Sequence, residues 1–232
     1  MSCNVIMLEK IRLGMKYIFS IPKTILFNFR IFPFLKAIKL PIFITNSVNC
    51  KDVYRGCIEI QGKTKMFMIF IGVGGSKAIE SKKGMIHISK KQNSKIIFKG
   101  NAKFSEGIVL YVNKGNLTIG NNFSSNKNCF IASDNNMKFG DDILLGWNVN
   151  IRDSDGHEII YNTPNAKIKD SKVSIGNHVW ICANTDILKG TKIGDDCVVA
   201  YRSCVLGLET FSNSLIGGYP AKILRNDINW KK

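Results

Sequence analysis

The chain of 232 residues has few acidic residues, few histidines and no long uncharged apolar run near its N-terminus. The chain has only 17 Asp and Glu residues but 33 Lys and Arg residues. The resulting net charge of +16 indicates attraction to an anionic partner, unless it serves solubility alone. The first apolar residues are interrupted by Lys16, Lys23, Arg30, Lys36 and Lys39, so no segment there reaches the roughly 18 uncharged residues of a spanning helix. A signal-peptide layout is also missing.

A redox or metal motif is also lacking, because the seven cysteines are scattered and form no C-x-x-C pair. We interpret them as reduced thiols of a cytosolic protein, several of them filling positions that suit a small hydrophobe. The glycine-rich piece GVGGSK at 72–77 has neither the spacing nor the Lys-Ser/Thr ending of a P-loop, so we predict a turn there.

The main pattern of the chain is an apolar residue at every sixth position. Neither a helix nor an amphipathic strand has this period, whereas a solenoid of triangular coils does, with each six-residue unit forming one face. Only Ser125 departs from the pattern. The ladder consists of Phe98, Phe104, Leu110, Ile119, Ser125, Ile131, Phe139, Leu145, Ile151, Ile175, Ile181, Ile187, Ile193, Val199 and Val205.

The corners and the one long interruption of the ladder can also be placed. Four ladder residues are followed by Gly and then Asn or Asp, in the sequences IGNN, FGDD, IGNH and IGDD, and these residue types tolerate tight corners. Residues 152–172 interrupt the ladder and contain Asp153, Asp155 and His157. A polar loop that leaves a rigid coil is a common place for a binding or catalytic group.

We divide the chain into four parts. Residues 1–45 are basic and aromatic, with one or two short helices expected, and they either cap the first coil, which we favour, or contact an anionic membrane surface. Residues 46–95 are predicted to form irregular first strands and coils. A β-helix follows over 96–221 with the loop 152–172, and 222–232 form a basic tail.

The ladder, the segments FGDDILLGWNVNIRDSDGHEI and IGNHVWICANTDILKGTKIGDDCVV, and the ending GGYPAKILR together resemble the hexapeptide-repeat acyltransferases over about residues 95–226. Within them the chain is similar to the maltose, galactoside, capsule and lipopolysaccharide O-acetyltransferases. The resemblance implies an all-β, left-handed parallel β-helix and a homotrimer with active sites between subunits. It also implies acetyl transfer from acetyl-CoA to a sugar hydroxyl. We expect no metal and a location in the cytoplasm, and the basic N-terminal segment suggests a glycan acceptor at the inner face of the membrane.

The resemblance assigns His157 as the catalytic residue, and a histidine suits a general base at neutral pH. It places Asn126 and Asp134 at the acceptor. To these we add Trp147 as a lining residue and Asp155, which, like Asp153, could orient the imidazole. The coenzyme-binding residues implied by the resemblance are Ala183, Tyr201, Lys222 and Arg225, with a backbone N–H near Ala183 as the oxyanion donor.

Three other functions were compared with this one. A γ-type carbonic anhydrase needs three histidines at one zinc site, and His87, His157 and His178 are not spaced for that; His178 is more typical of a corner. A nucleic-acid-binding solenoid is not expected, because the basic and aromatic residues lie outside any known nucleic-acid motif. N-acetylation of an amino sugar or another small amine stays as the alternative.

Overall fold

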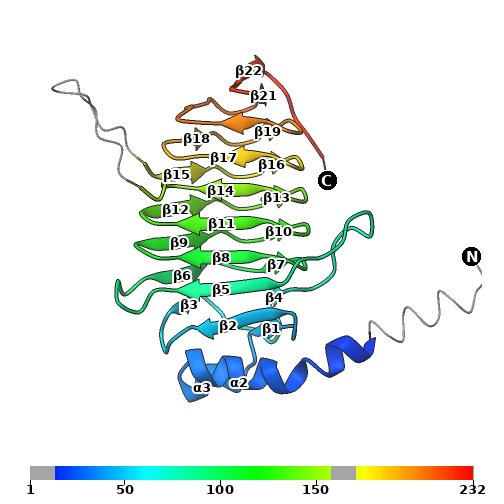
Figure 1. Ribbon diagram of the computed structural model, residues 1–232, viewed down its shortest axis with the longest axis vertical. Coiled ribbons are helices and arrows are strands. Elements are labelled where there is room, and N and C mark those ends of the chain that lie inside the picture. Colours follow the sequence, from blue (N-terminus) through cyan, green and yellow to red (C-terminus); the bar gives the residue numbers. More distant parts are fainter. Residues whose placement is uncertain (1–13, 158–170, 232) are drawn as a thin grey trace, which may run out of the picture.

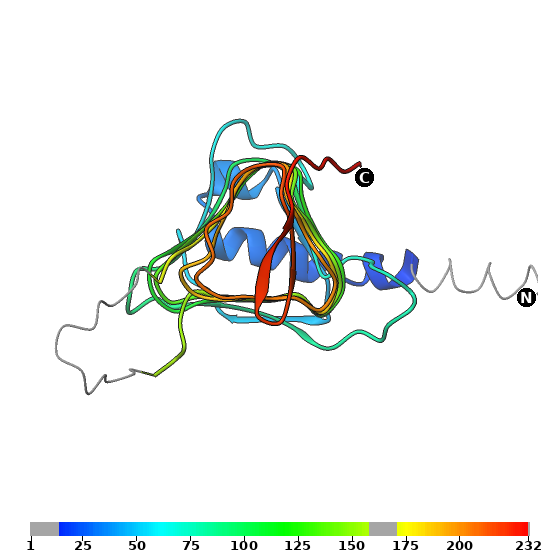
Figure 2. The ribbon, with the colours of Figure 1, turned by 90° about the horizontal axis from the view of Figure 1, so that it is seen from above.

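The computed structural model describes residues 14–157 and 171–231, which form a triangular prism (Figure 1). Its three sides are parallel sheets, here called A, B and C, and the chain passes through them in turn, as the view from above shows (Figure 2). The predicted fold, an all-β left-handed parallel β-helix with a short, partly helical N-terminal segment, is confirmed.

The strands of the three sheets succeed one another coil by coil. Sheet A contains β1 (Ile42–Ile44), β4 (Ile69–Ile71), β7 (Ala102–Phe104), β10 (Phe123–Ser125), β13 (Leu144–Leu145), β16 (Trp180–Ile181), β19 (Val198–Val199), β21 (Leu215–Gly218) and β22 (Ala221–Arg225). Sheet B contains β2 (Val48–Asp52), β5 (Gly84–Ile88), β8 (Val109–Val112), β11 (Phe130–Ser133), β14 (Asn150–Arg152), β17 (Asp186–Ile187) and β20 (Cys204–Val205). Sheet C contains β3 (Ile58–Ile60), β6 (Lys95–Phe98), β9 (Asn116–Ile119), β12 (Asn136–Phe139), β15 (Val173–Ile175) and β18 (Lys192–Ile193).

Every residue of the six-residue ladder is buried and stacks on its equivalent in the next coil. In sheet A, for example, Phe104, Ser125 and Leu145 occupy paired positions of neighbouring strands. The corners use the left-handed backbone region, as at Asn148 and His178, whose φ angles are +55° and +51°. Asn adopts this region at low cost, and for His178 the corner role is confirmed.

The β-helix begins before the regular six-residue ladder. Residues 46–95, predicted as irregular first strands and coils, lie in the first coils of the β-helix, which starts at β1. Ile44 stacks on Ile71, which stacks on Phe104, and the pairing of β2 with β5 shifts register after Asn49. Loops of unequal length hide the six-residue period there. The C-terminal boundary also differs, because Lys222 and Arg225 lie in β22, which pairs antiparallel with β21 at the end of sheet A. Such a strand covers an edge that would otherwise be open.

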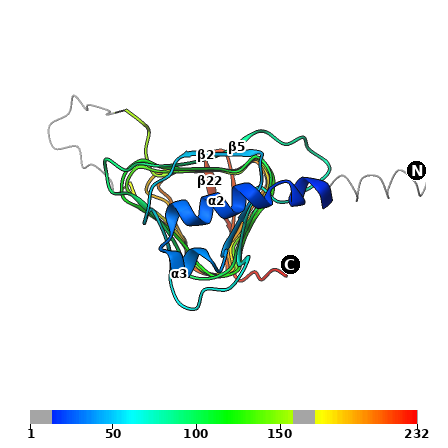
Figure 3. The same ribbon diagram turned by 90° about the horizontal axis from the view of Figure 1, so that it is seen from below.

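Two helices close the opposite end of the prism: α2 (Ile21–Ile31) and α3 (Phe34–Ala37). Helix α2 crosses the triangular base, as seen from below (Figure 3). The side chain of the buried Asn28 accepts a hydrogen bond from the Ile42 N–H (3.2 Å) and donates one to the Ile42 carbonyl (2.7 Å). The Thr24 hydroxyl likewise accepts from the Ile44 N–H and donates to the Ile44 carbonyl, both at 3.1 Å. Two side chains one helical turn apart thus replace a missing strand beside β1.

Within residues 14–157 and 171–231, no helix has the length and hydropathy of a membrane-spanning segment.

Candidate functional site

Four of the residues expected to bind substrates lie along one edge of the prism, the A–B corner, where the chain turns from sheet A to sheet B. Trp147, Ala183 and Tyr201 occupy equivalent positions after β13, β16 and β19. Asn126 follows β10 at the same edge. Trp147 is half-buried, Ala183 is buried and Tyr201 is exposed. The edge is rigid, because backbone hydrogen bonds join the corners of successive coils. In one of them the Asn184 N–H donates to the Trp147 carbonyl (2.9 Å).

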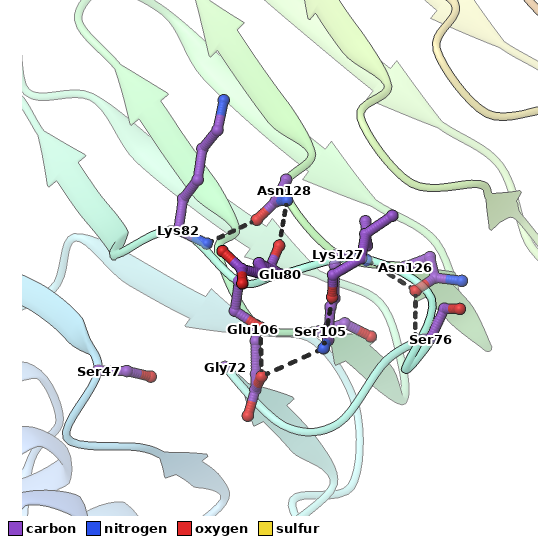
Figure 4. Close-up of polar contacts among 12 residues, drawn as sticks. Ser47, Gly72, Ser76, Glu80, Lys82, Ser105, Glu106, Asn126, Lys127 and Asn128 are labelled. Atoms are coloured by element: carbon purple, nitrogen blue, oxygen red, sulfur yellow. Dashed lines mark hydrogen bonds and ion pairs between the residues drawn. The ribbon is translucent and has the colours of Figure 1, made fainter.

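A loop between β4 and β5, residues 72–83, is attached to this corner (Figure 4). The Ser76 N–H donates to Asn126 Oδ1 (2.8 Å), and the Lys82 N–H donates to Asn128 Oδ1 (2.9 Å). Gly75, with φ of +113°, permits this close packing, because a Cβ there would lie 2.5 Å from Lys127 Cγ. The glycine-rich turn expected from the sequence therefore forms one wall beside Asn126.

The same loop creates a hollow of about 320 Å³ at the corner. Asn126 lines it together with Ser76, Lys103, Ser105 and Ser124. Polar groups converging in a concave site are what a sugar requires. The sequence pointed to Asn126 alone, because the other lining residues come from coils whose stacking the six-residue pattern does not reveal.

Below the loop, Glu106 carries a charge that is locally balanced. It pairs with Lys16 and Lys127 and accepts from the Ser81 hydroxyl. Burial alone would raise the pKa of Glu106, but the hydrogen bonds from Lys16 and Ser81 and the charges of Lys16 and Lys127 outweigh it, so the pKa lies below its ordinary value. This network ties the N-terminal segment and the loop 72–83 to the same coil.

The second group of predicted residues lies at another edge, the B–C corner, where the long insertion leaves β14. Asp153 is completely buried there. Its carboxylate accepts from the Asp134 N–H (2.6 Å), the Asn135 N–H (3.1 Å) and the Ser133 hydroxyl (3.0 Å). Burial raises the pKa of Asp153, and these donors oppose the rise. Asp153 therefore anchors the start of the insertion to the preceding coil.

His157 is exposed four residues beyond this anchor. Asp155 forms an ion pair with Lys189 of the next coil, and the Asp134 carboxylate accepts from Asn113 Nδ2 (2.8 Å). Among the described residues, neither Asp153 nor Asp155 is bonded to His157. The orienting role considered for them stays a prediction. Residues 158–170, the rest of the insertion, lie outside the described residues.

The two corners are far apart within one chain. Sheet B separates them, and its strand β11 alone has four residues, roughly 13 Å at about 3.3 Å per residue. The loop 72–83 and the end of β14 lie on opposite sides of the prism (Figure 1). The structure thus brings Asn126 and Trp147 to one edge but does not bring them to His157 within a single chain.

The remaining predicted residues and histidines lie elsewhere. Lys222 and Arg225 are exposed on β22, at the end of sheet A. His87 pairs with Asp52 (3.1 Å), and His178 pairs with Asp196 (2.8 Å) and stacks on Trp230 of the C-terminal segment. In the part of the chain that the structure describes, no group of three or more His, Cys, Asp or Glu side chains is arranged to hold a metal ion.

Triangular coils of parallel strands, with one buried residue at every sixth position, define a hexapeptide-type β-helix protein. The family model "Bacterial transferase hexapeptide (six repeats)" matches residues 172–207. Over 127 residues the chain is 30% identical to the "Galactoside O-acetyltransferase" of Escherichia coli K12, covering 54% of this chain and 62% of that protein. Over 134 residues it is 32% identical to the "Putative lipopolysaccharide biosynthesis O-acetyl transferase WbbJ" of the same organism, covering 53% and 68%.

Among solved structures, the polysialic-acid-specific acetyltransferase NeuO is similar with a TM-score of 0.49 and 20% identity, covering 82% of this chain and 78% of that one. The chain belongs to the bacterial hexapeptide-repeat transferases. It spans slightly less than two thirds of the galactoside enzyme that it matches.

Proposed function

We propose that the protein transfers an acetyl group from acetyl-CoA to a hydroxyl of a sugar, in the synthesis of a surface polysaccharide. Membership of the hexapeptide-repeat transferases supports group transfer, and the names of the two related proteins of E. coli support O-acetylation. The observation that carries the proposal is His157 at the start of an insertion that the buried Asp153 anchors to the rigid prism.

The chemistry needs a base, because a sugar hydroxyl is a weak nucleophile at neutral pH. His157 removes the hydroxyl proton while the oxygen attacks the thioester carbonyl carbon. When the tetrahedral intermediate collapses, the carbon–sulfur bond breaks and the coenzyme thiolate takes up the proton from His157. A histidine side chain meets this need, because one imidazole nitrogen can accept a proton and then give it up again.

We place acetyl-CoA and the oxyanion of the tetrahedral intermediate along the A–B corner. Gly146 packs closely against Ala183 of the next coil, since a Cβ at position 146 would lie 2.4 Å from the Ala183 nitrogen. The N–H of Ala183, at the same corner, is our proposed donor to the oxyanion. Lys222 and Arg225, exposed on β22, suit the phosphates of coenzyme A.

We further infer that each active site forms between subunits of a trimer. A cyclic ring of identical chains joins two different surfaces of each chain, since its interfaces are heterologous. Two corners that each carry part of the site, separated by sheet B, meet this requirement: the A–B corner of one subunit would face the B–C corner of its neighbour.

The first test is the variant His157→Ala, measured by release of free coenzyme A from acetyl-CoA in the presence of glycan acceptors. We expect a loss of about 10²–10⁴-fold, the usual contribution of a general base. His87→Ala is the matched control, because His87 lies on β5 and pairs with Asp52. Alkali-labile acetyl groups on the product identify an ester. A His157→Ala variant within a few-fold of the unchanged protein would overturn the assignment.

A second test addresses the shared site. Homotrimers of His157→Ala and of Asn126→Ala are each expected to be weak. When the two variants are unfolded together and refolded as a mixture, about a quarter of the interfaces should pair two intact corners and regain activity. Equal mixing without refolding is the control. If the refolded mixture has only the mean activity of the two variants, the site is contained in one chain.

A further inference from the structure

The end of the prism that α2 and α3 close has an unexpected surface. Large apolar side chains point outward there, with Phe19 69%, Leu26 71%, Phe34 64% and Leu35 76% exposed. We call this surface the apolar base. It consists of Ile18, Phe19, Ile21, Ile25, Leu26, Phe29, Phe34, Leu35 and Ile38.

The orientation of α2 is the reverse of that expected for a helix facing water. Its inward face buries the polar side chains of Thr24 and Asn28 against β1, together with Phe27 and Ile31. Its outward face presents the apolar side chains of Ile25, Leu26 and Phe29 to solvent, and Arg30 is exposed on the same helix. An exposed apolar surface of this kind in a globular protein marks an interaction site.

Positive charge lies beside the apolar base. A groove of about 510 Å³ runs beside α2 and is lined by Lys23, Arg30, Lys51 and Lys83. Arg30 Nη2 donates to the Lys51 carbonyl (2.7 Å), and Lys23 donates to the Val48 carbonyl, so backbone oxygens hold these two cations in place. The sequence from 14 to 51 contains no Asp or Glu, so the charged side chains of this stretch are all basic.

We propose that the apolar base binds the surface of an anionic lipid bilayer. In this arrangement the apolar side chains enter the boundary between headgroups and acyl chains, and Lys23 and Arg30 lie at the lipid phosphates. The base is the end face of the prism, crossed by α2 (Figure 3), so the coils above it stay clear of the bilayer.

A second copy of the chain suits this surface less well. Pairing base to base would bring the same basic groove of two copies together, in a protein whose net charge is already +16. An anionic bilayer supplies both the apolar interior and the opposite charge. The inference does not depend on acetyl transfer, since vesicle binding is measured without acetyl-CoA or acceptor.

The experiment is flotation of the full-length protein with vesicles of phosphatidylcholine containing about one quarter phosphatidylglycerol, and with vesicles of phosphatidylcholine alone. We expect binding to the anionic vesicles that weakens when salt rises from about 0.1 to 0.5 M. The double variant Leu26→Glu, Leu35→Glu should lose about tenfold or more in binding, because each new carboxylate is repelled and costly to bury. Both side chains are exposed, so thermal unfolding should not change.

The matched control is Phe211→Glu, which places a carboxylate at an 81% exposed aromatic residue near the other end of the prism. This variant should bind as the unchanged protein does. Lack of binding to anionic vesicles, or equal loss in the control variant, would overturn the proposal. So would sedimentation showing that the unchanged protein forms larger assemblies that the double variant dissociates, because the base would then bind a second copy.

Discussion

Replacing Asn28 by leucine tests how the β-helix is closed at its first coil. Leucine has nearly the same shape as asparagine but cannot bond to β1, so both the N–H and the carbonyl of Ile42 lose their partner. Asn28 and Ile42 are completely buried, which keeps water away. A buried backbone group without a partner costs about 1–3 kcal/mol, so the two groups together should lower the free energy of unfolding by about 2–6 kcal/mol.

The measurement is equilibrium unfolding in urea, at one fixed protein concentration because assembly affects apparent stability. Leu26→Ala is the control on the same helix, and as a change at an exposed side chain it should cost about 0.5 kcal/mol or less. A loss below about 1 kcal/mol for Asn28→Leu would refute the reasoning, since the edge of β1 would then find other partners. Vesicle binding by Asn28→Leu should be unchanged at a temperature where the variant is folded.

Two further predictions concern titrating groups. The pKa of Glu106 lies below its ordinary 4.5, so its ionised form stabilises the fold above that pH, and this contribution is lost as the pH falls through the folded-state pKa. The difference in free energy of unfolding between the unchanged protein and Glu106→Gln should therefore shrink in acid. The measurement is the urea midpoint of both proteins from pH 7 downward. An unchanging gap would contradict this ion-pair network. Burial raises the pKa of the Cys129 thiol to about 12. Iodoacetamide at neutral pH should therefore label the less buried Cys182 and Cys204 and spare Cys129, as measured by peptide mass spectrometry. Early labelling of Cys129 would contradict this and show that its coil opens.

The fold could be predicted because a β-helix repeats its environment. Each ladder residue packs on the same position of the next coil, so local spacing in the sequence corresponds to stacking in space. The first coils could be predicted only as irregular for the same reason: their connecting loops differ in length, and Ile44, Ile71 and Phe104 stack without sharing the six-residue spacing.

The candidate site could be predicted only in part. The insertion and His157 stand out because they interrupt a regular pattern. The burial of Asp153 does not, since an aspartate in a polar loop is ordinarily exposed, and only the coil beneath it supplies the N–H groups that hold it. Lys103 and Ser105 were missed because the hollow beside Asn126 requires the loop 72–83 to fold onto the corner.

The sequence by itself determined the coil, its corners and the position of the histidine insertion, because each depends on residue type and spacing along a few neighbouring residues. Tertiary structure alone decided which side of α2 faces water. The open edge of β1 needs hydrogen-bond donors and acceptors, so Thr24 and Asn28 turn inward and the apolar side chains are left outside. It also separated the predicted site residues between two corners, because a rigid triangular coil holds its edges a full sheet apart.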